Sequence, residues 1–139
     1  MDNITGIGFA GAGKMGGALL EGVLKAGLFA PSATWVAETD KARLASLESR
    51  LGVKPAELSE LAARCGVILV CVKPHLVSGV LGQMKDSLGP GKLVISIAAG
   101  VTLARIEAEV PDRTPVVRAM PNIAATLGQS ATAYAGGRF

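Results

Sequence analysis

Glycine is concentrated near the start of the chain, in the stretch GIGFAGAGKMGG at residues 6–17. Glycines at such spacing form loops whose backbone N–H groups bind phosphates. The G-x-G-x-x-G dinucleotide fingerprint fits this stretch at Gly6 and again at Gly11. The nucleotide-hydrolase pattern G-x-x-x-x-G-K also fits from Gly8, but Met15 stands where that pattern needs a Ser or Thr for Mg²⁺. The stretch therefore offers two phosphate-binding chemistries.

Each pattern requires a strand before its loop and a helix after it. Only the fingerprint that begins at Gly11 leaves a full strand, residues 4–10, in front of the loop. In that register Gly11 makes the tight turn, Gly13 lets a pyrophosphate approach backbone N–H groups, and Gly16 lets the helix pack close to the strand. We therefore predict a dinucleotide turn. The alternative is a glycine-rich packing turn that binds no ligand.

Glu38 follows the second expected strand, residues 34–37. An acidic residue at this point can accept hydrogen bonds from the adenosine ribose hydroxyls, and it repels a 2′-phosphate. The alternative role is a solvated carboxylate near the N-terminus of the next helix, where the helix dipole stabilises a negative charge.

Lys73 and Pro74 follow an apolar run at residues 67–72, which is typical of a strand buried on both faces. This strand is expected beside the first one, where Lys73 reaches the phosphates or the nicotinamide ribose. A solvated lysine at a strand end is the simpler alternative. The only histidine, His75, begins a helix without a catalytic partner nearby in the sequence, and we interpret it as a polar helix-start residue.

Apolar runs alternate with helical periodicity along the whole chain. Strands are expected at residues 4–10, 34–37, 53–54, 67–72, 93–97 and 116–120. Helices are expected at residues 15–24, 44–51, 58–64, 77–88 and 103–110, the last of them capped by Thr102. This order predicts an α/β fold, a doubly wound, mostly parallel, Rossmann-like sheet in a single dinucleotide-binding domain spanning residues 1–139.

Composition excludes several classes of protein. The 139 residues carry a net charge of +3 with scattered Lys and Arg, and aromatic residues make up 4%, so we expect no nucleic-acid partner. No apolar stretch is long enough for a membrane span, and the N-terminus lacks the basic segment of a secretion signal. Cys65 and Cys71 lack partners at metal-binding spacing, so we expect reduced thiols, no metal and a cytoplasmic location.

Four segments together resemble the N-terminal half of pyrroline-5-carboxylate reductase: GFAGAGKMGGALLEG at 8–22, CVKP at 71–74, VISIAAGVTL at 94–103 and VVRAMPN at 116–122. That family reduces the C=N bond of 1-pyrroline-5-carboxylate with NADPH or NADH and forms L-proline. The resemblance implies that Asn122 lies close to the nicotinamide and the substrate. It implies cofactor contacts from Ala12, Gly13, Lys14, Met15, Cys71, Val72, Lys73, Pro74, Ala98 and Ala99.

The chain departs from the family pattern at several points. Ile123-Ala124 replaces a common Thr-Pro, Leu58 replaces a frequent Asn, and Glu38-Thr39 stands where a basic or small polar residue favours NADPH. The first departure removes a hydroxyl and a rigid proline near the site, and the second removes one contact on the adenosine side. The Glu38-Thr39 departure leaves the choice between NADPH and NADH open, with a preference towards NAD. The sequence stops near the junction where the family's helical, dimer-forming domain begins. We therefore expect cofactor binding by this chain and little or no proline formation by the chain alone. The resemblance implies a homo-oligomer in the family, whose usual dimer-forming domain is missing from this sequence.

Two other functions also fit the sequence. One is the cofactor domain of a hydroxyacid-type dehydrogenase, which shares G-x-G-x-M-G but does not predict the AAG and MPN segments. The other is a non-catalytic dinucleotide-binding module.

Overall fold

A seven-stranded sheet runs through the centre of the molecule, and the computed structural model describes residues 4–139 of it. The strand order is β3-β2-β1-β4-β5-β6-β7, with every neighbouring pair parallel except the antiparallel pair β6–β7. The strands are β1 Ile7–Ala10, β2 Thr34–Ala37, β3 Lys54–Pro55, β4 Val67–Val70, β5 Leu93–Ser96, β6 Val116–Met120 and β7 Ala133–Gly136. The predicted doubly wound, mostly parallel sheet is confirmed.

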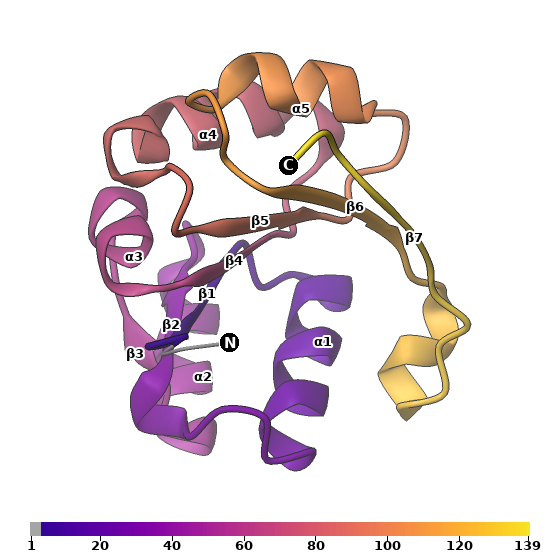
Figure 1. Ribbon diagram of the computed structural model, residues 1–139. Helices are drawn as coiled ribbons and strands as arrows, with labels where there is room; N and C mark the ends of the chain where they lie inside the picture. The colour runs from indigo at the N-terminus through magenta and orange to yellow at the C-terminus, as the bar shows by residue number, and fades with distance from the viewer. Residues whose placement is uncertain (1–3) are drawn as a thin grey trace.

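Helices cover both faces of this sheet, which makes a three-layer arrangement (Figure 1). The α-helices are α1 Lys14–Lys25, α2 Lys41–Leu51, α3 Leu58–Arg64, α4 Val77–Met84 and α5 Leu103–Glu109. Short 3₁₀ turns are η1 Pro31–Ala33, η2 Pro74–Leu76, η3 Lys85–Ser87 and η4 Ile123–Leu127. Helices α1 and α2 pack on one face, and α3, α4 and α5 pack on the other.

Local signals explain where the helices begin and end. Asp40 caps α2 because its carboxylate accepts the Arg43 N–H at 3.0 Å, and Gly52 ends the same helix in the left-handed conformation, with φ +70°. The predicted cap of α5 is also present, since the Thr102 hydroxyl accepts the Arg105 N–H at 3.2 Å. These caps set the positions of the loops that precede the helices.

The core consists of two apolar clusters, one on each face of the sheet. On the α1 face, Phe9 and Leu20 are fully buried, and on the other face Leu81 and Ile106 are fully buried. All four residues of β1 are buried because helices cover both of its faces. Strand β1, which leads into the glycine turn, therefore lies in the core of the sheet, as does its neighbour β4.

Gly8 allows α3 to pack directly on β1. A β-carbon at Gly8 would collide with the side chain of Leu61, and it would lie 3.2 Å from the sulfur of Cys65. A helix reaches this depth only over a strand position without a side chain. The small residue in β1 is thus explained by packing, independently of any ligand.

The structure corrects several element boundaries. The first strand begins at Ile7 rather than residue 4, and β4 ends at Val70 rather than residue 72. The α-helical part of α4 ends at Met84, beyond which the chain continues as the turn η3. Strand β7 was not predicted, because its exposed residues AYAG show no alternation of apolar and polar side chains.

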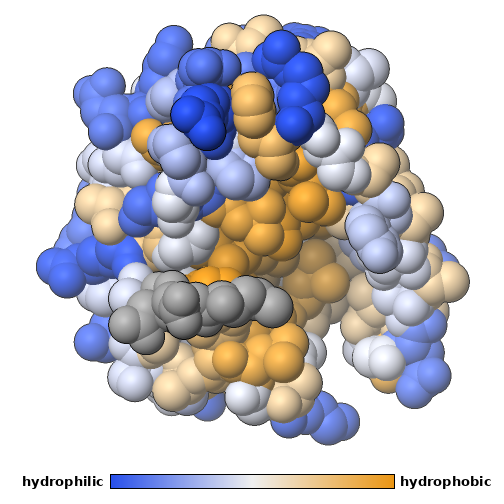
Figure 2. All heavy atoms as spheres, in the orientation of Figure 1, coloured by the Kyte–Doolittle hydropathy of each residue, from blue (hydrophilic) through white to orange (hydrophobic). Residues whose placement is uncertain are grey.

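One part of the sheet is less covered on the α1 face. Leu93 and Ile95 of β5 point to this face and are only half-buried. Figure 2 shows apolar side chains gathered in a hollow on the same side of the molecule. Within residues 4–139 no helix has the length and apolarity needed to cross a membrane.

Candidate functional site

The residues predicted to do chemistry lie at one edge of the sheet. They follow the carboxyl ends of β1, β2, β4, β5 and β6, which are neighbours and run parallel. Chain order reverses at β1, which pairs with β2 on one side and with β4 on the other. Ligands of open α/β sheets bind at such a reversal, outside the carboxyl ends of the strands.

The turn between β1 and α1 has the geometry of a phosphate-binding loop. Gly11 has φ +92°, and its N–H donates to the Ala37 carbonyl at 2.9 Å, which ties the turn to the end of β2. Gly13 precedes α1 without a side-chain cap, and nothing lies within 4 Å of a β-carbon built on it. The start of α1 therefore has no side-chain cap, so its first N–H groups can donate to an incoming anion.

Lys14 and Met15 form the start of α1, so their backbone N–H groups belong to this uncapped first turn. The side chain of Lys14 is exposed, whereas Met15 is half-buried. The positive charge of Lys14 thus lies at the edge of the turn, in solvent.

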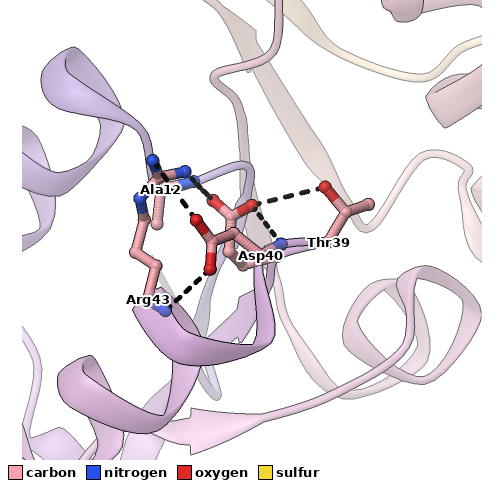
Figure 3. A network of polar contacts seen from close by, with 5 residues as sticks. Ala12, Thr39, Asp40 and Arg43 are labelled. Atoms are coloured by element: carbon pink, nitrogen blue, oxygen red, sulfur yellow. Dashed lines mark hydrogen bonds and ion pairs between the residues drawn. The ribbon is translucent and has the colours of Figure 1, made fainter.

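Glu38 is nearly enclosed, with 7% of its side chain exposed. Its Oε2 accepts the backbone N–H of Ala12 at 2.9 Å, and its Oε1 accepts the backbone N–H of Asp40 at 3.0 Å. Arg43 contacts the same Oε2 at 3.3 Å. Figure 3 shows how these donors converge from the glycine turn and from the start of α2. The carboxylate therefore joins the two loops, and the N–H of Ala12 is already paired.

The environment of Glu38 favours its ionised form. Burial by itself raises the pKa of the carboxyl group, but the hydrogen bonds from Asp40, Ala12 and Arg43 and the positive charge of Arg43 outweigh this effect. The net result is a pKa below the ordinary value of 4.5. Glu38 is consequently a fixed negative charge at neutral pH.

The loop after β4 carries the predicted CVKP residues. The N–H of Cys71 donates to the Ala10 carbonyl at 2.8 Å, and burial raises the pKa of its thiol to about 12. The Cys71 side chain faces Gly16 of α1, so it packs against the helix as a neutral thiol. Lys73 and Pro74 are exposed, and the Lys73 carbonyl accepts the Leu76 N–H at 2.9 Å to start η2.

The loops after β5 and β6 lie farther along the same edge. Ala98 is buried and donates its N–H to the Ser96 hydroxyl at 3.3 Å, whereas Ala99 is exposed. Asn122 caps η4, because its Oδ1 accepts the Ala124 N–H at 3.1 Å and its Nδ2 donates to the Ala131 carbonyl at 3.4 Å. Asn122 thus shapes the loop that follows the MPN segment.

A cavity of about 810 Å³ opens beside the end of β2. Gly11, Glu38 and Val72 line it together with the neighbouring His75 and Leu58. The first turn of α1, the Ala98–Ala99 loop and Asn122 lie outside its wall. The predicted site residues therefore form two groups. One group lines the cavity next to β2, and the other lies along the more open edge at the ends of β4, β5 and β6.

Two features of this edge do not follow from the motifs in the sequence. Arg43 belongs to none of these motifs, although its helical spacing from the cap residue Asp40 indicates that the two side chains lie close together. Arg118 of β6 has a buried Nε atom for which residues 4–139 supply no hydrogen-bond acceptor. In the same part of the chain, no group of three or more His, Cys, Asp or Glu side chains is arranged to hold a metal ion.

Comparison with known proteins relates this geometry to reductases. Residues 6–100 match the family described as NADP oxidoreductase, coenzyme F420-dependent. A pyrroline-5-carboxylate reductase of Methanosarcina acetivorans is 41% identical over 133 residues, which make up 95% of this chain and 49% of that protein. The Escherichia coli K12 pyrroline-5-carboxylate reductase is 36% identical over 127 residues, or 91% of this chain and 47% of that protein.

Solved structures agree with these relatives. A pyrroline-5-carboxylate reductase from Coxiella burnetii superimposes with a TM-score of 0.91 at 30% identity, covering 98% of this chain and 51% of that one. The Plasmodium falciparum pyrroline carboxylate reductase, solved with NADP bound, has a TM-score of 0.84 at 29% identity and covers 99% of this chain and 50% of that one. The chain spans about half the length of the curated relatives it matches.

Proposed function

Because this chain belongs to the family described as NADP oxidoreductase, coenzyme F420-dependent, we propose that it is the dinucleotide-binding domain of a pyrroline-5-carboxylate reductase. It binds NADPH or NADH, and the whole protein reduces 1-pyrroline-5-carboxylate to L-proline. One observation carries the proposal: the glycine turn, CVKP, AAG and MPN segments all follow adjacent parallel strands at one edge of the sheet. The identity of 41% with the Methanosarcina reductase supports the choice of reaction.

The residues at this edge suit a dinucleotide. The uncapped first turn of α1 and the open space at Gly13 accommodate a pyrophosphate, and Lys14 adds a positive charge at the rim. The cavity beside Glu38 accommodates the adenosine end. When bound, the reduced nicotinamide supplies a hydride to the carbon of the substrate C=N bond.

The chain's own residues act mainly by positioning. The Cys71, Val72, Lys73 and Pro74 loop lies next to the glycine turn, and the small side chains of Ala98 and Ala99 leave room at the neighbouring strand end. Asn122 orients the nicotinamide and the substrate from the end of β6. An imine is protonated easily, so correct placement of the two reactants is the principal requirement and a strong base is unnecessary. A small-molecule substrate, a homo-oligomeric enzyme and a cytoplasmic location are further parts of this proposal.

Fluorescence titration of the 139-residue chain with NADH and with NADPH tests the binding step. We expect saturable binding of at least one dinucleotide. Absence of binding to both would reject the proposal in favour of a module without cofactor.

A second experiment tests the reaction. It measures the reduction of 1-pyrroline-5-carboxylate by the protein at its natural length, monitored through the loss of NAD(P)H absorbance. Oxidation of hydroxyacids in place of imine reduction would favour the dehydrogenase alternative.

A further inference from the structure

Glu38 is attached to the glycine turn itself. Its Oε2 accepts the Ala12 N–H at 2.9 Å and its Oε1 accepts the Asp40 N–H at 3.0 Å (Figure 3). If the carboxylate turned away, the Ala12 N–H would lose its acceptor, which is costly for a group away from water. The negative charge of Glu38 therefore stays at the wall of the cavity.

Glu38 can still accept one more hydrogen bond. A carboxylate offers about four lone-pair positions, and Ala12, Asp40 and Arg43 use three of them. The Thr39 hydroxyl lies 3.5 Å from Oε1, a long contact that another hydroxyl can replace. One ribose hydroxyl thus fits Glu38 without breaking its link to the turn.

The cation nearest to Glu38 is already shared between two carboxylates. Arg43 lies 3.3 Å from Glu38 and 3.7 Å from Asp40. Asp40 is itself held in place because it caps α2. The positive charge of Arg43 is therefore already compensated by two carboxylates, which weakens its attraction for a phosphate.

The remaining charges of the cavity wall are also mainly negative. The carboxylates of Glu38, Glu57 and Glu60 line it, against the single amine of Lys41. Glu60 is paired with Arg64 at 2.9 Å. The 2′-phosphate of NADPH carries about two negative charges at pH 7, and these charges are repelled by the carboxylates of the cavity wall. The 2′-hydroxyl of NADH carries no charge.

Resting on the function proposed above, we propose that Glu38, fixed by the Ala12 N–H, makes this chain select NADH, whose adenosine ribose has a free 2′-hydroxyl, over NADPH. The selection differs from the cofactor found in the Plasmodium falciparum structure, which contains NADP. It arises from the placement of a charge next to the turn and requires no change in the turn itself.

Dissociation constants for NADH and NADPH, measured by isothermal titration at one ionic strength, test the selection. We expect the wild-type chain to bind NADH at least about tenfold more tightly, and Glu38→Gln to reduce this ratio about tenfold by strengthening NADPH binding. Glutamine has a similar volume and retains one oxygen that can accept the Ala12 N–H, so the link to the turn is kept. Its NH2 group cannot accept the Asp40 N–H, and that second hydrogen bond is lost. Arg43→Gln removes a positive charge from the same network and should increase the preference for NADH.

Glu57→Gln is the matched control, because it removes the same charge from another part of the cavity wall. We expect it to change the ratio less than Glu38→Gln does. Equal or tighter binding of NADPH by the wild-type chain would overturn the inference and leave the proposed function intact. An equal loss of both affinities in Glu38→Gln would also overturn it, because Glu38 would then act only on the shape of the turn. Failure of the wild-type chain to bind either dinucleotide would instead reject the proposed function.

Discussion

Gly16 and Gly11 lie in direct contact across the turn between β1 and α1. A β-carbon on Gly16 would stand 2.6 Å from the carbonyl oxygen of Gly11, and it would also lie 2.9 Å from Cβ of Cys71. Real β-carbons do not approach a backbone oxygen so closely, so α1 reaches this position only because residue 16 has no side chain. The third glycine of the fingerprint is therefore required by the packing of the helix on the sheet.

We expect Gly16→Ala to destabilise the fold. The added methyl group must displace backbone atoms, and overpacking of this kind costs about 1–3 kcal/mol. Urea unfolding measured by circular dichroism would report this loss. Gly22→Ala in the same helix is the control, because nothing lies within 4 Å of its β-carbon, and alanine there should stabilise the helix by about 0.5–1 kcal/mol. Equal stability of the two variants would contradict the packing argument.

Gly13→Ala should separate folding from ligand binding. Nothing lies within 4 Å of a β-carbon at this position, and the backbone there is extended with φ −65°, so alanine is tolerated. The methyl group would nevertheless occupy the space through which a pyrophosphate approaches the N–H groups of α1. We expect an unchanged melting temperature with NADH affinity reduced about tenfold or more. An unchanged affinity would place the phosphates elsewhere.

The ionised Glu38 should make the stability of the chain depend on pH. Its pKa is lower in the folded chain than the ordinary value of 4.5, so the folded state binds fewer protons than the unfolded state. The resulting stabilisation is complete above that value and is lost as the pH falls through the folded-state pKa. Glu38→Gln lacks it. The difference in the free energy of unfolding between wild type and this variant should therefore shrink below about pH 4.5, as measured by urea titrations across the acidic range. A constant difference would exclude this role.

Asn122→Ala should loosen η4 without unfolding the domain. The variant loses the acceptor of the Ala124 N–H and the donor to the Ala131 carbonyl, both of which are exposed interactions. We expect faster amide hydrogen exchange in Ile123–Leu127 and little change in global stability. Asn122→Asp is the informative comparison, because it keeps the acceptor and removes the donor. Exchange in Asn122→Ala as slow as in wild type would show that packing alone holds η4.

Much of the fold was predictable from local patterns in the sequence. The apolar runs and helical spacings placed β2, β6 and α3 at their observed bounds, since these signals depend only on neighbours along the chain. The register of the glycine turn was predictable for the same reason. Of the possible registers, only the one that begins at Gly11 leaves a full strand before the loop. Strand β7 was not predictable, since its pairing depends on β6 and its own residues carry no strand pattern.

The arrangement around Glu38 depended on tertiary structure. The sequence alone placed Glu38 at the end of a strand. It left two possible roles open, a residue that binds the ribose and a solvated carboxylate. Ala12 lies 26 positions earlier in the chain, and the two meet because β1 and β2 pair in parallel with Ala10 opposite Ala37. The register between β1 and β2 thus places Glu38 against the glycine turn, where its charge is largely buried and accepts the Ala12 N–H. This contact cannot be predicted from spacing in the sequence, because it forms only when the sheet brings together two residues that are far apart along the chain.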